Sequence, residues 1–139
     1  MGRWLRLGLL ALIAVFVALQ LVPVERTNPP VGSDVDAPEE VEAILRRSCY
    51  DCHSHETRWP WYSYVAPVSW FVVNHVNDGR GDLNFSEWPT FDFEAQDLAL
   101  SDVREQITKG EMPLPSYLIL HPNARLSEDD KAALLDWAK

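Results

Sequence analysis

The sequence predicts an all-helical domain that follows a membrane helix. Apolar residues recur at helical spacing in several segments, and no segment alternates apolar and polar residues with the period of two that marks a half-buried strand. A long uncharged apolar stretch near the start indicates the membrane helix. The hydrophobic content of 47% and the six Trp residues favour a packed core over disorder.

The charge is distributed unevenly along the 139 residues. The whole chain has 12 Lys and Arg against 21 Asp and Glu, a net charge of −9 at pH 7. Residues 27–139 carry 9 of these basic and 20 of these acidic residues, a net charge of −11. This excess of negative charge argues against binding to nucleic acid and favours a partner protein with a basic docking patch. Oligomeric state is left open.

Residues 7–24 contain one polar residue, Gln20, and no charge. As a helix this stretch spans about 27 Å, close to the roughly 30 Å hydrocarbon core of a bilayer. Arg3 and Arg6 precede it and favour the cytoplasmic side. A cleaved signal peptide is the alternative, but Ala18-Leu19-Gln20 is a poor cleavage site. We predict a retained anchor at 1–24, a Pro-rich linker at 25–37 and an exported domain at 38–139.

The first helix of the domain is predicted to begin near Pro38, a residue suited to a first turn. Acidic residues fill its first turn and Arg46 and Arg47 its last, as the helix dipole favours. Its apolar face leads to Cys49, and we expect the helix to run straight into that residue.

Proline and glycine divide the rest of the chain. Residues 57–66 are predicted to be irregular because Pro60 interrupts them, and a second helix is predicted from Pro67 to a stop at Gly79. Residues 84–93 are predicted to form a loop. A third helix is expected within 94–109, with Ser101 as an alternative start and Gly110 as its end.

Two prolines dominate residues 111–116, which we expect to be non-helical and to hold Met112 on an extended segment. Ser127 is predicted to cap the last helix, whose first turn is acidic. The first and last helices of the domain are expected to pack against each other.

The chemistry centres on Cys49-Tyr50-Asp51-Cys52-His53, a C-x-x-C-H motif. This motif signals covalent attachment of a c-type haem, because two thiols add to the two vinyl groups on one haem edge and the adjacent His supplies an axial nitrogen. A thioredoxin-like dithiol is an alternative, but it normally lies in a βαβ setting. A zinc site is another, but His53 and His55 crowd each other.

A haem iron that only carries electrons has a sixth ligand, and we predict Met112 in this role. It is the sole Met beyond the first residue, and its segment contains Pro113 and Pro115. The alternative for any Met is gap-filling in a core. Among the histidines, His75 is the main rival ligand, His55 is expected to be a solvated loop residue, and His121 is expected to tie down a turn.

An aromatic segment follows the motif. We predict that it lines the haem pocket and that Arg58 binds a haem propionate. Ordinary core packing, with Arg58 in solvent, is the alternative interpretation. The candidate aromatic pocket residues are Trp59, Trp61, Tyr62, Tyr64, Trp70 and Tyr117.

Three blocks of sequence resemble the bacterial haem-binding domain family of small exported proteins with one c-type haem. They are SCYDCHSHETRWPWYSYVAPVSWFV, LNFSEW and EMPLPSYLILHPNARLSEDDK. The resemblance covers most of residues 39–138 and implies a class I cytochrome c-like fold. It implies thioether bonds at Cys49 and Cys52, with His53 as proximal and Met112 as distal iron ligand. The family commonly has Asn at the position of His55, so His55 inherits no role.

The function predicted is that of an electron carrier and not an enzyme: a cytochrome with one haem c, anchored in the inner membrane and facing the periplasm. With His53 and Met112 both on iron, no position stays open for a substrate. The alternative is a sensing module in which a small ligand displaces Met112. A small peroxidase would need an open iron face and a base, for which His75 is the candidate.

Overall fold

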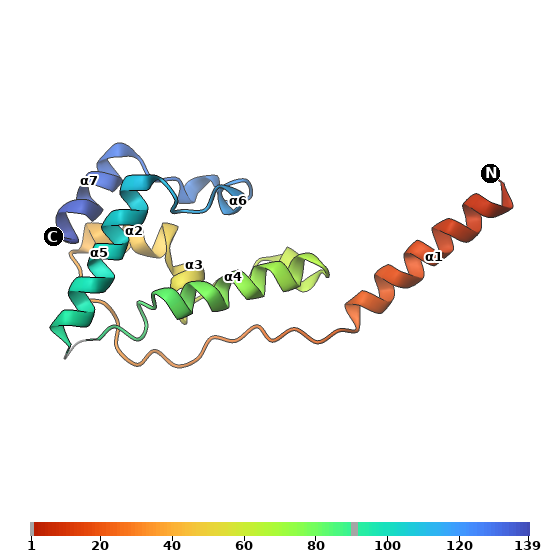
Figure 1. Ribbon diagram of the computed structural model, residues 1–139, viewed down its shortest axis with the longest axis horizontal. Coiled ribbons are helices and arrows are strands. Elements are labelled where there is room, and N and C mark those ends of the chain that lie inside the picture. Colours follow the sequence, from red (N-terminus) through yellow and green to blue (C-terminus); the bar gives the residue numbers. More distant parts are fainter. Residues whose placement is uncertain (1, 90–91) are drawn as a thin grey trace. The chain divides into compact units, whose positions relative to one another are not determined.

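The computed structural model describes residues 2–89 and 92–139, so residues 90 and 91 of the predicted 84–93 loop lie outside it. The chain divides into unit 1, Met1–Thr27 and Trp59–His75, and unit 2, Asn28–Arg58 and Val76–Lys139. Each unit is described by itself. The helices, labelled where possible in Figure 1, are α1 Arg3–Gln20, α2 Glu39–Ser48, α3 Tyr50–His53, η1 Trp61–Tyr64, α4 Val68–Asp82, α5 Phe93–Lys109, α6 Pro115–Leu118, η2 Pro122–Ala124 and α7 Glu128–Trp137.

The all-helical prediction is confirmed for the described residues, which contain these helices and one isolated bridge between Ser33 and Glu87 but no strand. The N-terminal helix α1 has no buried residue. By length and composition it is long and apolar enough to cross a membrane, a property that a retained anchor and a signal sequence share.

In unit 2, helix α2 packs against α7, as predicted, and α5 also packs against α7. A row of aromatic rings runs through this core: Phe85 lies between Tyr50 and Trp88, at centroid distances of 5.3 and 6.1 Å. Burial of these large rings stabilises the helix packing. Capping residues set the start of α7, where Ser127 and Asp130 form a capping box.

The first helix leads directly into Cys49, as predicted, because the Cys49 N–H donates to the Leu45 carbonyl at 2.8 Å and caps α2. Helix α2 ends at Ser48, and Cys49 adopts φ −126° and ψ −37° before α3 begins at Tyr50. The break lets α3 leave α2 in a new direction (Figure 1). It therefore separates the helix that packs in the core from the turn that carries the motif.

The prediction that Gly79 stops the second helix was wrong, since α4 continues to Asp82. The reason for glycine at this position is a close approach between elements. A Cβ on Gly79 would lie 2.9 Å from the carbonyl oxygen of Cys52 and 3.2 Å from its Cβ. Gly79 therefore lets α4 touch the backbone of the motif turn.

Other boundaries follow local sequence more closely. Helix α5 begins after Asp92, whose carboxylate accepts a hydrogen bond from the Ala95 N–H, so Ser101 is not its cap. It ends at Gly110 with φ +70°, as predicted. The 111–116 segment is helical at its end, because Pro115 opens the short helix α6 and needs no N–H there.

The expectation that His55 is solvated was wrong, because its side chain is only 7% exposed. Its Nδ1 donates to the carbonyl of Pro30 at 2.9 Å, and its Nε2 accepts from the Asn84 amide at 2.9 Å. Residues 28–37 run along unit 2 and cover this histidine, since Ser33 Oγ also donates to the Trp88 carbonyl at 2.6 Å. His55 therefore ties three segments of unit 2 together.

Candidate functional site

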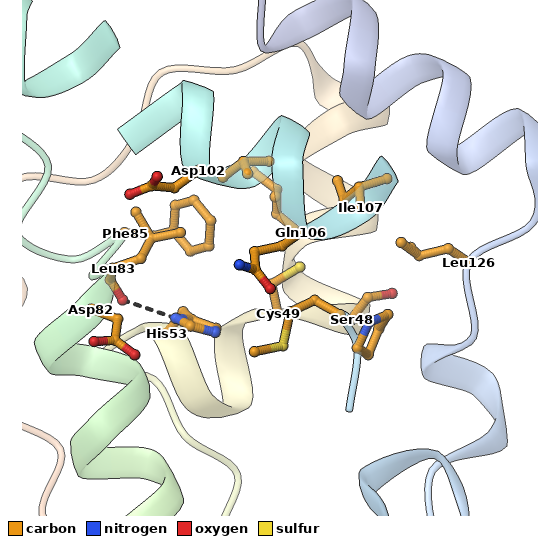
Figure 2. A pocket seen from close by; sticks show the side chains of 14 residues that line it. Ser48, Cys49, His53, Asp82, Leu83, Phe85, Asp102, Gln106, Ile107 and Leu126 are labelled. Carbon is orange, nitrogen blue, oxygen red and sulfur yellow. Dashed lines mark hydrogen bonds between the residues drawn. The ribbon is translucent and has the colours of Figure 1, made fainter. Parts of the chain in front are cut away.

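Unit 2 contains a cavity of about 410 Å³ beside the motif turn. Figure 2 shows Asp82, Leu83, Phe85 and Asp102 along one side and Ser48, Ile107 and Leu126 along the other. The walls are mostly apolar, with a few polar groups, as in ligand sites of this size. The lining residues are Leu45, Ser48, Cys49, His53, Asp82, Leu83, Phe85, Asp102, Val103, Gln106, Ile107, Met112, Pro113 and Leu126.

The motif forms one tight turn at the edge of this cavity. The N–H groups of Cys52 and His53 both donate to the Cys49 carbonyl, at 3.1 and 3.0 Å. These two hydrogen bonds close the turn from Cys49 to His53. Cys49 and His53 line the cavity directly, while Cys52 lies against Gly79 of α4.

The ring of His53 is oriented by two backbone carbonyls. Its Nδ1 lies 2.8 Å from the Gly79 oxygen and 3.1 Å from the Leu83 oxygen, the second contact drawn in Figure 2. A carbonyl only accepts, so Nδ1 carries the proton and Nε2 keeps its lone pair. Metal-binding histidines typically donate their other ring N–H to such a partner. His53 is thus prepared to bind a metal through Nε2.

Both cysteines are free thiols. Burial, reinforced by the nearby Cys52, raises the pKa of the Cys49 thiol to about 12. Burial, reinforced by Asp51, raises the pKa of the Cys52 thiol to about 11. Both thiols are therefore protonated at neutral pH in the free protein.

Met112 lines the same cavity as Cys49 and His53, in the middle of the five-residue segment 110–114 between α5 and α6. That segment is tied to the motif by Tyr117 of α6, whose hydroxyl donates to Asp51 Oδ2 at 2.7 Å. Asp51 Oδ1 also accepts from the Arg58 backbone N–H at 3.1 Å. Asp51, the second variable residue of the C-x-x-C-H motif, therefore connects the loop that contains Met112 to the turn that contains His53.

Several polar groups of the cavity were not predicted from the sequence. The Ser48 hydroxyl is buried and finds no hydrogen-bond partner among the described residues. Gln106 extends from α5 toward Cys49 and His53 in Figure 2. Asp102 and Gln106 are four residues apart in α5, beside its predicted buried stripe. That i, i+4 spacing was the sequence signal that both side chains face the cavity.

Two other predicted pocket residues, Arg58 and Tyr117, belong to unit 2 but do not line this cavity. Arg58 is exposed, and its Nε donates to Asp51 Oδ1 at 3.3 Å. Tyr117 contacts Asp51 and stacks on His121, whose Nδ1 donates to the Tyr117 carbonyl at 3.1 Å. His75 belongs to unit 1, where its Nδ1 donates to the Phe71 carbonyl at 2.9 Å. Unit 1 also contains the five aromatic residues predicted for the pocket wall, Trp59, Trp61, Tyr62, Tyr64 and Trp70.

The sequence matches the haem-binding domain family over residues 14–139, and the chain belongs to this family. The match begins within α1 and includes the motif turn, the cavity and α7. Searches of curated proteins and of solved structures return no match. Haem is therefore the cofactor that family membership supports.

The cavity residues fit a haem. The site combines a mostly apolar wall, an imidazole with a free Nε2, a thioether at Met112 and the thiol of Cys49. The unpaired Ser48 hydroxyl is a buried polar atom for which a bound group would provide a partner. When bound, haem supplies an iron that changes between two oxidation states.

Proposed function

We propose that the chain is a membrane-anchored periplasmic cytochrome with one c-type haem, and that it transfers electrons. Cys49 and Cys52 hold the haem through thioether bonds, His53 and Met112 are the axial ligands, and the helical unit has a class I cytochrome c-like arrangement. The observation that carries the proposal is that His53, with its Nδ1–H bound to two carbonyls, and Met112 line one cavity.

The chain's own residues supply three properties of an electron carrier. Two carbonyls hold the His53 ring in one orientation, so Nε2 needs no reorganisation between oxidation states. The bond from Tyr117 to Asp51 holds the loop of Met112 against the motif. Residues such as Leu45, Phe85 and Ile107 form an apolar wall against which the haem would pack. A His and Met ligand pair raises the reduction potential relative to other pairs.

The location and the partner follow from the N-terminal segment and the charge. Retention of α1 would keep the protein in the inner membrane, with Arg3 and Arg6 on the cytoplasmic side. The haem-binding part would then lie in the periplasm, where c-type haem is attached. Its net charge of −11 favours a redox partner with a basic patch.

The test compares visible spectra of the full chain, made in a bacterium that matures c-type cytochromes, before and after reduction. Wild type is expected to be six-coordinate and low-spin, with the weak long-wavelength sulfur-to-iron band. Met112→Ala is expected to lose that band, and His75→Ala is expected to keep it. Haem should stay with the wild-type chain in a denaturing gel but not with a Cys49→Ser/Cys52→Ser variant.

Two results would overturn parts of this proposal. A wild-type spectrum that is high-spin, or unchanged in Met112→Ala, would remove Met112 as a ligand and favour the sensing alternative. Haem released from wild type by denaturation would exclude covalent attachment. Spectral change on adding carbon monoxide to the reduced protein would indicate that the distal position opens.

A further inference from the structure

Residues 59–75 form a segment without charge in a chain of which 24% is charged. They contain no Asp, Glu, Lys or Arg. Four large side chains of this segment are nevertheless exposed: Trp61 by 78%, Tyr64 by 58%, Phe71 by 54% and Val68 by 44%. We call these four residues the aromatic patch. Exposed large apolar side chains gathered in one short uncharged stretch of sequence favour an interaction surface.

The rest of this segment is buried or half-buried to different degrees. Ser63, Ala66, Ser69 and Val73 are buried, at 0%, 4%, 3% and 8% exposure. The aromatic residues Trp59, Tyr62 and Trp70 are half-buried. The Ser63 hydroxyl is satisfied internally, since it donates to the Pro60 carbonyl at 2.6 Å. The four residues of the aromatic patch are therefore the large apolar side chains that the packing of this segment leaves exposed.

The patch is attached directly to the end of α1. Gln20, the last residue of that helix, donates to the Ala66 carbonyl at 3.2 Å and accepts from the Ala66 N–H at 2.9 Å. Six residues later, Arg26 donates to the Ser63 carbonyl at 3.0 Å, and its guanidinium lies 4.4 Å from the Tyr64 ring centroid. The segment that leaves α1 is thus held against the segment that carries the patch.

The attachment determines the depth at which the patch would lie in a membrane. Helix α1 has 18 residues and is about 27 Å long, so a bilayer core of roughly 30 Å places Arg3 near one interface and Gln20 near the other. Ala66, bonded to Gln20, then lies at the second interface. Trp and Tyr are the side chains that concentrate at this level of a bilayer.

We propose that the aromatic patch docks on the lipid surface of the bilayer that α1 crosses, so that unit 1 has two membrane contacts. The occupant of the patch is the interfacial layer of the exported leaflet. Trp61 and Tyr64 place their rings among the headgroups, and Val68 and Phe71 cover apolar surface. The proposal rests on retention of α1, which is part of the proposed function.

The test uses the full haem-loaded chain in phospholipid vesicles and a photoreactive benzoylphenylalanine in place of Phe71. Irradiation is expected to give phospholipid adducts on the chain, measured by mass spectrometry. The matched control carries the same probe in place of Phe93, an aromatic of unit 2 that is 81% exposed. Adducts at position 71 are expected to exceed those at position 93 several-fold.

A second measurement separates docking from mere proximity to the anchor. Trp61→Glu/Phe71→Glu, with the probe at position 64, is expected to lose most of its lipid adducts, because carboxylates leave the interface for water. Phe93→Glu, with the same probe, is expected to keep them. An unchanged haem spectrum shows that unit 2 is folded in each variant, and an unchanged helical circular dichroism signal is required of the whole chain.

The outcomes distinguish the two proposals. Equal adduct yields at positions 71 and 93, in a chain whose mass shows that α1 is intact, overturn docking and leave the anchored cytochrome standing. Unaltered adducts in the double-Glu variant also overturn docking. A mature chain that lacks α1 removes the anchor, whatever the haem spectrum shows.

Discussion

Gly79→Ala tests the contact between α4 and the motif turn. The new Cβ would lie 2.9 Å from the Cys52 carbonyl oxygen and 3.3 Å from the carbonyl carbon. Both atoms are backbone, so α4 or α3 must shift by a few tenths of an ångström. The Gly79 carbonyl also accepts from His53 Nδ1, so the shift would disturb the ring that faces the cavity.

The magnitude follows from comparison with Gly81→Ala in the same last turn of α4. A Cβ at Gly81 meets nothing within 4 Å. Both substitutions gain helix propensity, up to about 1 kcal/mol, so that contribution nearly cancels between them. Overpacking typically costs about 1–3 kcal/mol. We therefore expect Gly79→Ala to be about 1–3 kcal/mol less stable than Gly81→Ala.

The assay is guanidinium unfolding of the haem-loaded full chain in detergent, followed by tryptophan fluorescence, with the midpoint and slope fitted for each variant. Gly79→Ala should also change the haem spectrum, whereas Gly81→Ala should not. Equal unfolding free energies and identical spectra for the two variants would refute the close-packing argument.

Further predictions concern residues around the cavity. His55→Ala should lower the free energy of unfolding by about 1–3 kcal/mol, because Pro30 and Asn84 lose a buried partner, while the haem spectrum stays unchanged; a spectral change would contradict its structural role. Tyr117→Phe should cost about 1–3 kcal/mol by removing the bond to Asp51, measured by the same unfolding assay, with His121→Ala as a neighbouring control. Burial, then the hydrogen bond to Asp51, raises the pKa of Tyr117, so its stabilising contribution is complete below the unfolded pKa of about 10 and lost as pH rises through the folded pKa. Wild type should accordingly lose more stability than Tyr117→Phe between pH 9 and 12, roughly the range around that unfolded pKa, and parallel pH curves would exclude this linkage. Ser127→Ala should cost about 1 kcal/mol by removing the capping box of α7, and an unaltered unfolding midpoint would show that the cap is unimportant.

Much of the fold was predictable because the relevant forces are local. Apolar spacing predicted the helices, and Gly110 and Ser127 marked a helix end and a helix start by side-chain and backbone geometry within a single turn. The C-x-x-C-H motif is also local, since Cys49 and His53 are only four residues apart and a single hydrogen-bonded turn brings them together. Haem binding was predicted from that motif, and family membership supports it.

Contacts between distant segments required the tertiary structure. Gly79 has the local pattern of a helix stop, and only the approach of Cys52 explains why α4 continues through it. His55 has polar neighbours in sequence, yet Pro30 and Asn84 bury it. The sequence by itself thus determined the helices, the motif and the uncharged segment 59–75. Tertiary packing decided which backbone atoms meet the motif, which histidine is buried and which aromatic rings face outward, because burial depends on residues that are remote along the chain.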